Sequence, residues 1–285
     1  MSAEIIDLDY GGRSGALGAW LSGETMIDCG PSACLPRLLE GLGERRPRVL
    51  LLTHIHFDHA GAAGALIERW PDLEVYVHPR GAAHLIDPSR LVASARRVFG
   101  ERFDSLLGEV VAIPEKNLHT IQDGDLIEGF RAVWTPGHAK HHVAFLDEES
   151  GRAYCGDVAG VRLAPGVVIP PTPPPDIDLT AWRRSLEIIE GRQPRSLALA
   201  HYGPVEDPVL HLAELREALA RHEGWAREGE EVFVERLSEY LRTRMGASEA
   251  EDYDFTALAR PSAAGMRRWL EREQAAQEAT PGAPA

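Results

Sequence analysis

The sequence has few cysteines, no long apolar run and no excess of positive charge. Its 285 residues include three cysteines, and their spacing fits neither a disulfide framework nor a zinc ribbon. We therefore expect Cys29, Cys34 and Cys155 to be small core residues of a protein in a reducing cytoplasm. No stretch approaches the ~18 apolar residues of a membrane span, and residues 1–10 lack the basic and apolar segments of a secretion signal.

The bulk composition indicates a soluble globular protein, since 44% of residues are hydrophobic and 26% are charged. The length suits one large domain or two ordinary ones, at ~150 residues per domain. A net charge of −14 makes nucleic acid an unfavourable partner, because an acidic surface repels phosphate. We expect a small-molecule substrate and no membrane contact.

Short apolar segments alternate with helical patterns through the first 205 residues, which predicts an α/β fold with helices layered over sheet. Beyond residue 206 the pattern is helical, and we expect a helical extension over 206–275 and a frayed tail over 276–285. The helices from residue 207 are expected to form part of a pocket wall with the segment "PPTPPPD", or to pack on the core or on a second subunit as a homodimer. Strands are predicted at 4–10, 25–30, 48–53, 73–78, 109–113, 118–121, 127–135, 142–147, 152–157 and 195–201, and helices at 33–42, 60–70, 79–108, 179–191, 207–245 and 263–277.

The stretch "THIHFDHAG", residues 53–61, places four titratable side chains directly after the apolar run "RVLLLT". His54 and His56 are two residues apart in extended chain and so can reach one point. Asp58 and His59 follow where the chain turns into a helix. Imidazole and carboxylate groups packed this densely suit zinc, iron or manganese. Four donors exceed the need of one tetrahedral ion with an open position, so we infer two metal ions.

Further ligands are expected at the ends of other strands, because ligands of α/β sheets gather at the carboxyl ends of strands. His138 in "TPGH", Asp157 in "YCGD" and His201 in "LALAH" each follow a short apolar strand. A lone histidine in such a place says little, but three such residues beside the cluster point to one shared site.

At this point the sequence resembles the metallo-β-lactamase-fold hydrolases, over roughly residues 3–205. The resemblance rests on "IDCG", "THIHFDH", "TPGH", "CGD" and "AH" in this order. It implies a four-layer αβ/βα sandwich with the metals at one edge. It also implies that His54, His56 and His138 hold one ion and that Asp58, His59 and His201 hold the other, with Asp157 bridging them.

The chemistry implied is hydrolysis by a hydroxide that bridges two divalent ions, most simply Zn²⁺, with Fe or Mn as alternatives. Asp58 and Asp157 are the expected catalytic carboxylates, and Asp58 can orient the hydroxide or move its proton. The expected substrate is an ester, a thioester or a related small molecule.

Four further residues lie close to these motifs. Asp28 in "IDCG" is expected either to bond within the metal loop or to form a turn. His142 either lines the pocket or is a structural histidine. Tyr202 either contacts substrate or is a buried phenol with one hydrogen bond. His141 is expected to face outward, by alternation with His142 along a strand.

Departures from family patterns narrow the choice to a glyoxalase II-like hydrolase of the HxHxDH type. His56 stands where the di-iron flavoproteins of this fold carry glutamate, and Gly160 stands where quorum-quenching lactonases carry tyrosine. The acidic charge disfavours the nucleases of the fold. The open alternatives are a persulfide dioxygenase with a single iron, a lactonase and a phosphodiesterase.

Overall fold

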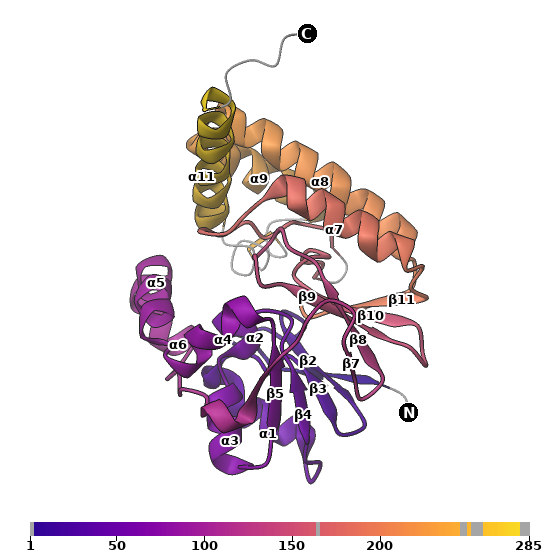
Figure 1. Cartoon of the computed structure of the whole chain (residues 1–285). Helices are drawn as coiled ribbons and strands as arrows, with labels where there is room; N and C mark the ends of the chain where they lie inside the picture. The colour runs from indigo at the N-terminus through magenta and orange to yellow at the C-terminus, as the bar shows by residue number, and fades with distance from the viewer. Residues whose placement is uncertain (1–2, 164–165, 246–249, 252–258, 280–285) are drawn as a thin grey trace.

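Two six-stranded β-sheets form the centre of the molecule (Figure 1). The structure is a computed structural model and describes residues 3–163, 166–245, 250–251 and 259–279. The first sheet has the order β1-β2-β3-β4-β5-β6, and the second has the order β12-β11-β10-β9-β8-β7. The strands are β1 Glu4–Asp7, β2 Gly18–Ser22, β3 Thr25–Ile27, β4 Val49–Leu51, β5 Glu74–Val77, β6 Leu118–Thr120, β7 Leu126–Ile127, β8 Phe130–Trp134, β9 Val143–Asp147, β10 Arg152–Gly156, β11 Ser196–Leu199 and β12 Gly203–Val205.

Helices cover the outer face of each sheet (Figure 1). In the first half of the chain they connect parallel strands, and in the second half α7 connects the parallel strands β10 and β11, while α8, α9 and α11 follow the last strand. Asp178 accepts a hydrogen bond from the amide of Ala181 and so caps α7. The helices are α1 Leu35–Leu42, α2 Phe57–Ala60, α3 Ala63–Arg69, α4 Pro79–Ile86, α5 Ser89–Phe99, α6 Phe103–Leu106, α7 Leu179–Gly191, α8 Pro208–Glu228, α9 Glu230–Met245 and α11 Ala259–Glu278.

The strand β4 shows why its sequence is apolar at every position. Leu50 points to the helices and joins a buried cluster with Leu38 and Leu66. Leu51 points to the second sheet and joins a different cluster with Phe145. A strand buried on both faces needs a continuous apolar run, because alternate side chains face opposite layers.

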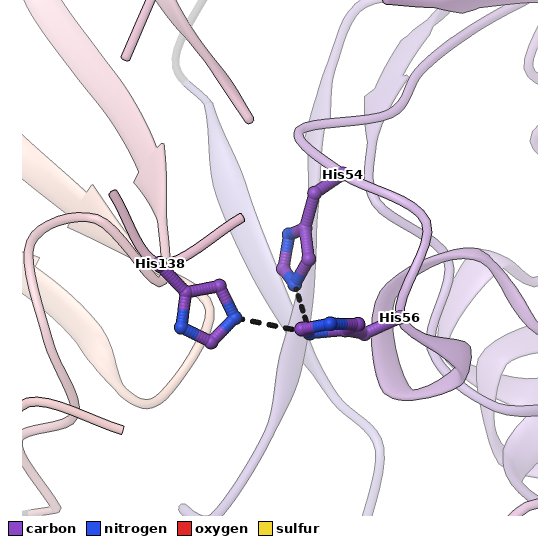
Figure 2. A group of neighbouring side chains, drawn as sticks. All are labelled: His54, His56 and His138. Carbon is purple, nitrogen blue, oxygen red and sulfur yellow. Dashed lines mark hydrogen bonds between the residues drawn. The ribbon is translucent and has the colours of Figure 1, made fainter. Parts of the chain in front are cut away.

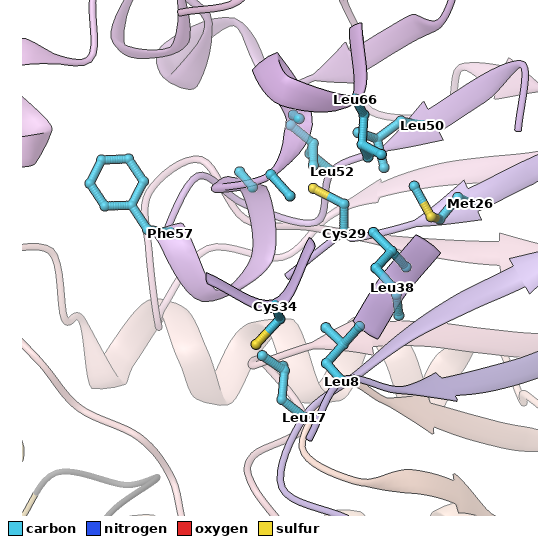
Figure 3. Close-up of a cluster of buried hydrophobic side chains, with 14 of the residues drawn as sticks. Leu8, Leu17, Met26, Cys29, Cys34, Leu38, Leu50, Leu52, Phe57 and Leu66 are labelled. Atoms are coloured by element: carbon cyan, nitrogen blue, oxygen red, sulfur yellow. The ribbon is translucent and has the colours of Figure 1, made fainter. Parts of the chain in front are cut away.

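The cysteines are part of these apolar clusters, as predicted. Cys29 and Cys34 lie in the cluster between the first sheet and its helices, together with Leu38 and Leu50 (Figure 3). Cys155 lies in the cluster on the outer face of the second sheet. All three are buried free thiols, and burial raises the pKa of Cys155 to about 12.

The second sheet also packs against the other sheet on one face and against helices on the other face. Tyr154 of β10 faces the first sheet, whereas the next residue, Cys155, faces the helices and packs in one cluster with Trp182 of α7 and Leu215 of α8. The layers therefore run helix, sheet, sheet, helix. The αβ/βα sandwich predicted from the sequence is confirmed.

The C-terminal helices α8, α9 and α11 pack on one another and on the second sheet's outer cluster. Phe233 and Leu237 of α9 and Trp269 of α11 are buried in that cluster. The helical extension is thus confirmed as an element of the fold, while the domain division at residue 205 and the homodimer stay predictions. Residues 280–285 of the predicted tail lie outside the described residues. Within the described part of the chain, every helix is too short or too polar to cross a membrane.

The strand predictions differ from the structure at several places. The short strand β12 is not among the predicted strands, and the strand predicted over 127–135 joins the end of β7 to β8. Residues 18–22 form β2, which the predicted strands leave out because glycine and alanine obscure the apolar pattern. Residues 109–113, predicted as a strand, pair with no sheet. They cross α3 instead, where the Val111 carbonyl lies so close to Gly64 that a Cβ there would collide with it.

Candidate metal centre

The cluster of residues 54–59 begins where β4 ends, next to the end of β3. The two strands are parallel, with Ile27 opposite Leu51, so their carboxyl ends meet at one edge of the sheet. Asp28 follows β3 directly, and its carboxylate accepts a hydrogen bond of 2.8 Å from the amide of Thr53. This bond fixes the chain just before His54.

Three imidazoles form the first group of donors (Figure 2). The Nε2 atoms of His54 and His138 each lie 3.0 Å from Nδ1 of His56. His54 and His138 are buried, and His56 is partly exposed. His138 comes from the loop after β8, so the group joins the edges of both sheets. Three converging nitrogens with one open side are a suitable ligand set for one metal ion.

The second group contains Asp58, His59 and His201, whose donor atoms all lie within 4.8 Å of one another. A carboxylate oxygen of Asp58 lies 3.5 Å from Nε2 of His201 and 3.9 Å from Nε2 of His59. Asp58 and His59 belong to α2, and His201 follows β11. This group also draws on both sheets.

Asp157 lies between the two groups. Its Oδ2 atom is 3.4 Å from Nε2 of His138, and its Oδ1 atom is 3.1 Å from Nε2 of His59. The preceding residue, Gly156, has a φ of +44°, and a Cβ there would collide with the Thr53 side chain. Only glycine allows β10 to approach the loop after β4 this closely.

Hydrogen bonds on the far side of the rings orient four of the imidazoles. Nδ1 of His59 bonds to Asp28 at 2.8 Å, and Nδ1 of His54 bonds to the Thr53 hydroxyl at 3.0 Å. Nδ1 of His138 lies 2.9 Å from the carbonyl oxygen of Pro171, and Nδ1 of His201 lies 2.7 Å from that of Ala16. Carbonyl and carboxylate oxygens accept the Nδ1 proton, which leaves Nε2 free to bind a metal. The Thr53 hydroxyl extends this network, because it donates to Asp28 at 2.8 Å.

The first group is uncharged in the metal-free site. Burial, then the neighbouring His138, lower the pKa of His56 to about 4. Burial, then His59 and His56, hold the pKa of His54 well below its usual range. Neutral imidazoles present the lone pairs that a metal ion needs.

The second group is rich in negative charge. Burial alone lowers the pKa of His59, but the carboxylates of Asp157, Asp28 and Asp58 outweigh it and hold that pKa well above its usual range. Within the described structure, Nε2 of His59 and Oδ1 of Asp157 are buried without a hydrogen-bond partner. Nδ1 of His59 bonds to Asp28, so Nε2 is the atom that faces the Asp157 oxygen, at 3.1 Å. The raised pKa shows that this position between a ring nitrogen and a carboxylate favours a positive charge, which a metal ion supplies when it replaces the proton, so the residues present fit metal ions.

The donors open into a cavity lined by His56, Asp58, His138, Asp157 and His201. Its other lining residues are five residues of α5, four prolines of the segment 171–175, and Phe57, Leu107 and Val161. The prolines belong to the "PPTPPPD" segment expected in the pocket wall. The expectation that helices from residue 207 line the pocket is wrong for the described residues, because α8, α9 and α11 contribute none of them. Helix α5 was missed as a lining element, although its apolar residues at positions 91, 95, 98 and 99 fall on one helical face.

The structure places the neighbouring residues His142 and Tyr202 outside the described cavity lining. His142 is a buried histidine whose Nδ1 lies 2.8 Å from the Thr135 hydroxyl, and it is not among the described residues that line the cavity. Tyr202 packs at the edge of the second sheet's outer cluster and is likewise not a lining residue. The prediction that His141 faces outward is wrong, since it is only 8% exposed. Residues 140–141 form a turn before β9, so strand alternation does not extend to them.

Two buried groups of histidine and aspartate donors at the edge of an αβ/βα sandwich define a metal-dependent hydrolase. The sequence profile of the metallo-beta-lactamase superfamily matches residues 22–201, and the chain belongs to this superfamily.

Individual relatives are distant. The metallo-beta-lactamase fold-containing protein ST1585 of Sulfurisphaera tokodaii is 28% identical over 181 residues, which are 61% of this chain and 67% of that protein. A hydroxyacylglutathione hydrolase of Legionella pneumophila (strain Lens) is 28% identical over 131 residues, which are 46% of this chain and 41% of that protein. This chain thus matches less than half the length of that hydrolase.

Solved structures agree on the fold. The metallo-beta-lactamase family protein TTHA1429 from Thermus thermophilus superposes with a TM-score of 0.66 at 23% identity and covers 96% of this chain and 94% of that one. TTHA1623, solved in a di-iron-bound form, gives a TM-score of 0.52 at 25% identity and covers 75% of this chain and 92% of that one.

Proposed function

We propose that the protein is a binuclear metal-dependent hydrolase that cleaves an ester or thioester bond of a small molecule. The observation that carries this proposal is the position of Asp157, which offers one oxygen to each donor group. A carboxylate shared between two donor groups in this way suits a site with two metal ions better than a site with a single ion. The groups would hold one ion at His54, His56 and His138 and the other at Asp58, His59 and His201.

The donor set of imidazoles and carboxylates, without a thiolate, is compatible with Zn²⁺, Fe or Mn. Zn²⁺ is our first choice because it favours His and Asp ligands and needs no redox partner. The di-iron form of TTHA1623 is consistent with iron in a related centre. The number of ions is therefore a sharper test than their identity.

When bound, the ions supply an activated water at neutral pH and polarise the oxygen of the bond to be cut. Asp58 is placed to manage the proton of that water, because its side chain is 26% exposed and lines the cavity. Burial raises its pKa, but His59 and His201 together lower it to about 2. The carboxylate is thus ionised at neutral pH and can accept a hydrogen bond from the attacking water.

Support for the bond type comes from the hydroxyacylglutathione hydrolases among the relatives, whose name denotes hydrolysis of an acylated glutathione. Among the described residues, no serine or cysteine side chain forms a hydrogen bond with a donor nitrogen or a carboxylate oxygen of the site. The Cys29 thiol bonds to the backbone carbonyl oxygens of Gly30 and His59 instead. Ser94 lines the cavity from α5, and the cysteines are buried with raised pKa values. A water nucleophile therefore accounts for the site most simply.

The test is metal analysis by mass spectrometry together with assays on esters and thioesters. We expect two ions per chain and hydrolysis without oxygen uptake. The variant Asp157→Ala should abolish hydrolysis and lower the metal content below two ions. Asp72→Ala is the control, because that side chain is 87% exposed and pairs only with Arg46 among the ion pairs of the described residues.

Two results would contradict the proposal. Full activity and two ions in Asp157→Ala would remove the shared-carboxylate argument. One iron per chain, with oxygen uptake in the presence of a persulfide, would establish the dioxygenase alternative instead.

A further inference from the structure

Helix α5 carries an apolar stripe that the fold covers only in part. Leu91, Ala95, Val98 and Phe99 line the metal cavity together with Ser94, at spacings that place all five on one face of the helix. Leu91, Ala95 and Phe99 also pack against the edge of the cluster between the first sheet and its helices, but no residue of α5 is fully buried. Val98 is 37% exposed. Figure 1 shows α5 standing apart from the two sheets.

The facing side of the cavity consists of prolines. Pro171, Pro173, Pro174 and Pro175 line it, and proline has no backbone N–H to donate. Behind them, Thr172 bonds to Ser262 of α11 at 3.2 and 3.1 Å, which holds the segment in place. We call α5 residues 91–99 and residues 171–175 together the apolar wall.

Neither lysine nor arginine lines the cavity among the described residues. The nearby arginine of α5, Arg96, is engaged elsewhere, because its guanidinium bonds to Asp104 at 2.8 Å and lies 4.2 Å from the Phe103 ring centroid. A phosphate or a peptide carboxylate on the substrate would find no partner at the apolar wall. Charged thioesters such as those of glutathione therefore do not suit this cavity.

We propose that the substrate carries, beside the bond that is cut, an uncharged apolar arm several carbons long that lies against the apolar wall. This inference rests on the proposed hydrolytic function and specifies its substrate class. The arm and the reacting bond belong to one molecule, because the same cavity is lined by the apolar wall and by His56, Asp58 and Asp157.

A binding series tests the apolar wall without relying on turnover. Acetate, butanoate, hexanoate and octanoate are titrated into the zinc-loaded protein by calorimetry. Each methylene that enters the cavity should strengthen binding by about fourfold, and the heat-capacity change should become more negative with chain length. Equal affinities across the series would overturn the inference.

Matched variants test whether the apolar arm of the ligand binds at Val98. Val98→Asn should weaken octanoate binding several-fold more than acetate binding, whereas Val98→Leu should preserve the dependence on chain length. The control is Val209→Asn, because Val209 is also a solvent-exposed valine on a helix, 66% exposed, but does not line the cavity. An unchanged chain-length dependence in Val98→Asn would contradict the placement of the arm.

Turnover assays separate this inference from the proposed function. One series of esters lengthens the acyl chain and keeps the leaving group constant, and a second series lengthens an alkyl leaving group on a constant acetyl ester. If kcat/KM rises with chain length in the first series, the apolar arm of the substrate is its acyl chain; if it rises in the second series, the apolar arm is the leaving group. Faster cleavage of a glutathione thioester than of an octanoyl thioester would overturn the inference and leave the hydrolase. Chain-length-dependent binding without any hydrolysis would overturn the hydrolase and support the apolar wall.

Discussion

Replacing Asp28 with asparagine tests whether this residue orients the metal site or only shapes a turn. Its φ is +55°, a conformation that asparagine tolerates well. A residue needed only for the turn should therefore accept the substitution. If Asp28 orients the metal site, the substitution should weaken metal binding, because the carboxylate accepts hydrogen bonds from both Thr53 and His59.

The size of the effect follows from the hydrogen bonds. Asp28 accepts bonds of 2.8 Å from the amide and the hydroxyl of Thr53 and from Nδ1 of His59. An asparagine oxygen can replace the acceptor for the Thr53 amide, which turns the NH₂ group towards His59. The His59 proton then moves to Nε2, the atom that faces Asp157. Loss of a buried charge-assisted bond costs about 1.5–3 kcal/mol, so we expect metal affinity to fall by about 10- to 100-fold.

The assay is competition for zinc with a chelator of known affinity, with circular dichroism to confirm the fold. We expect one of two ions to be lost at lower chelator concentration in Asp28→Asn. Asp178→Asn is the control, because asparagine caps a helix as well as aspartate does and residue 178 caps α7. Two ions held as tightly in Asp28→Asn as in the wild type would refute the orienting role.

Two further predictions concern the C-terminal helices. Gly265→Ala should lower the melting temperature and raise KM, because a Cβ there would collide with the Thr172 carbonyl and displace the apolar wall. The control is Gly224→Ala, which has open space around it and should stabilise α8 by up to about 1 kcal/mol. Equal melting temperatures and KM values in the two variants would contradict this prediction. His222→Leu should reduce acid sensitivity, since burial, then Arg221, lower the pKa of His222 from 6.5 to about 3. Its neutral form contributes stability that is complete above pH 6.5 and is lost as the pH falls towards 3, by at most about 5 kcal/mol. Urea titrations between pH 4 and 7 measure this, and parallel losses in wild type and variant would show that His222 is not the cause.

The fold and the donor positions were predictable because local patterns encode them. The run before Thr53 is apolar at each position, as a strand between two layers must be. The donors His54, His138 and His201 each follow a short strand, so a rule about strand ends brings them to one edge. These predictions depend on short segments and on where each strand ends.

Other features depend on contacts between distant segments, which no local pattern shows. Residues 109–113 run over α3, where Gly64 leaves room for the Val111 carbonyl. His141 is buried because a turn, not a strand, precedes β9. The stripe on α5 was visible in the sequence, but its spacing does not reveal that it faces a cavity instead of a core.

The segment of prolines links the substrate cavity to the metal donors through one covalent stretch. The carbonyl of Pro171 accepts the Nδ1 proton of His138, and Pro173, Pro174 and Pro175 line the cavity. Proline fixes φ, so this stretch moves as a stiff unit. A molecule in the cavity that shifts this proline segment therefore also alters the hydrogen bond between Pro171 and His138. Thermodynamic linkage makes the effect mutual, so an ion bound at His138 changes the affinity of the cavity by the same factor.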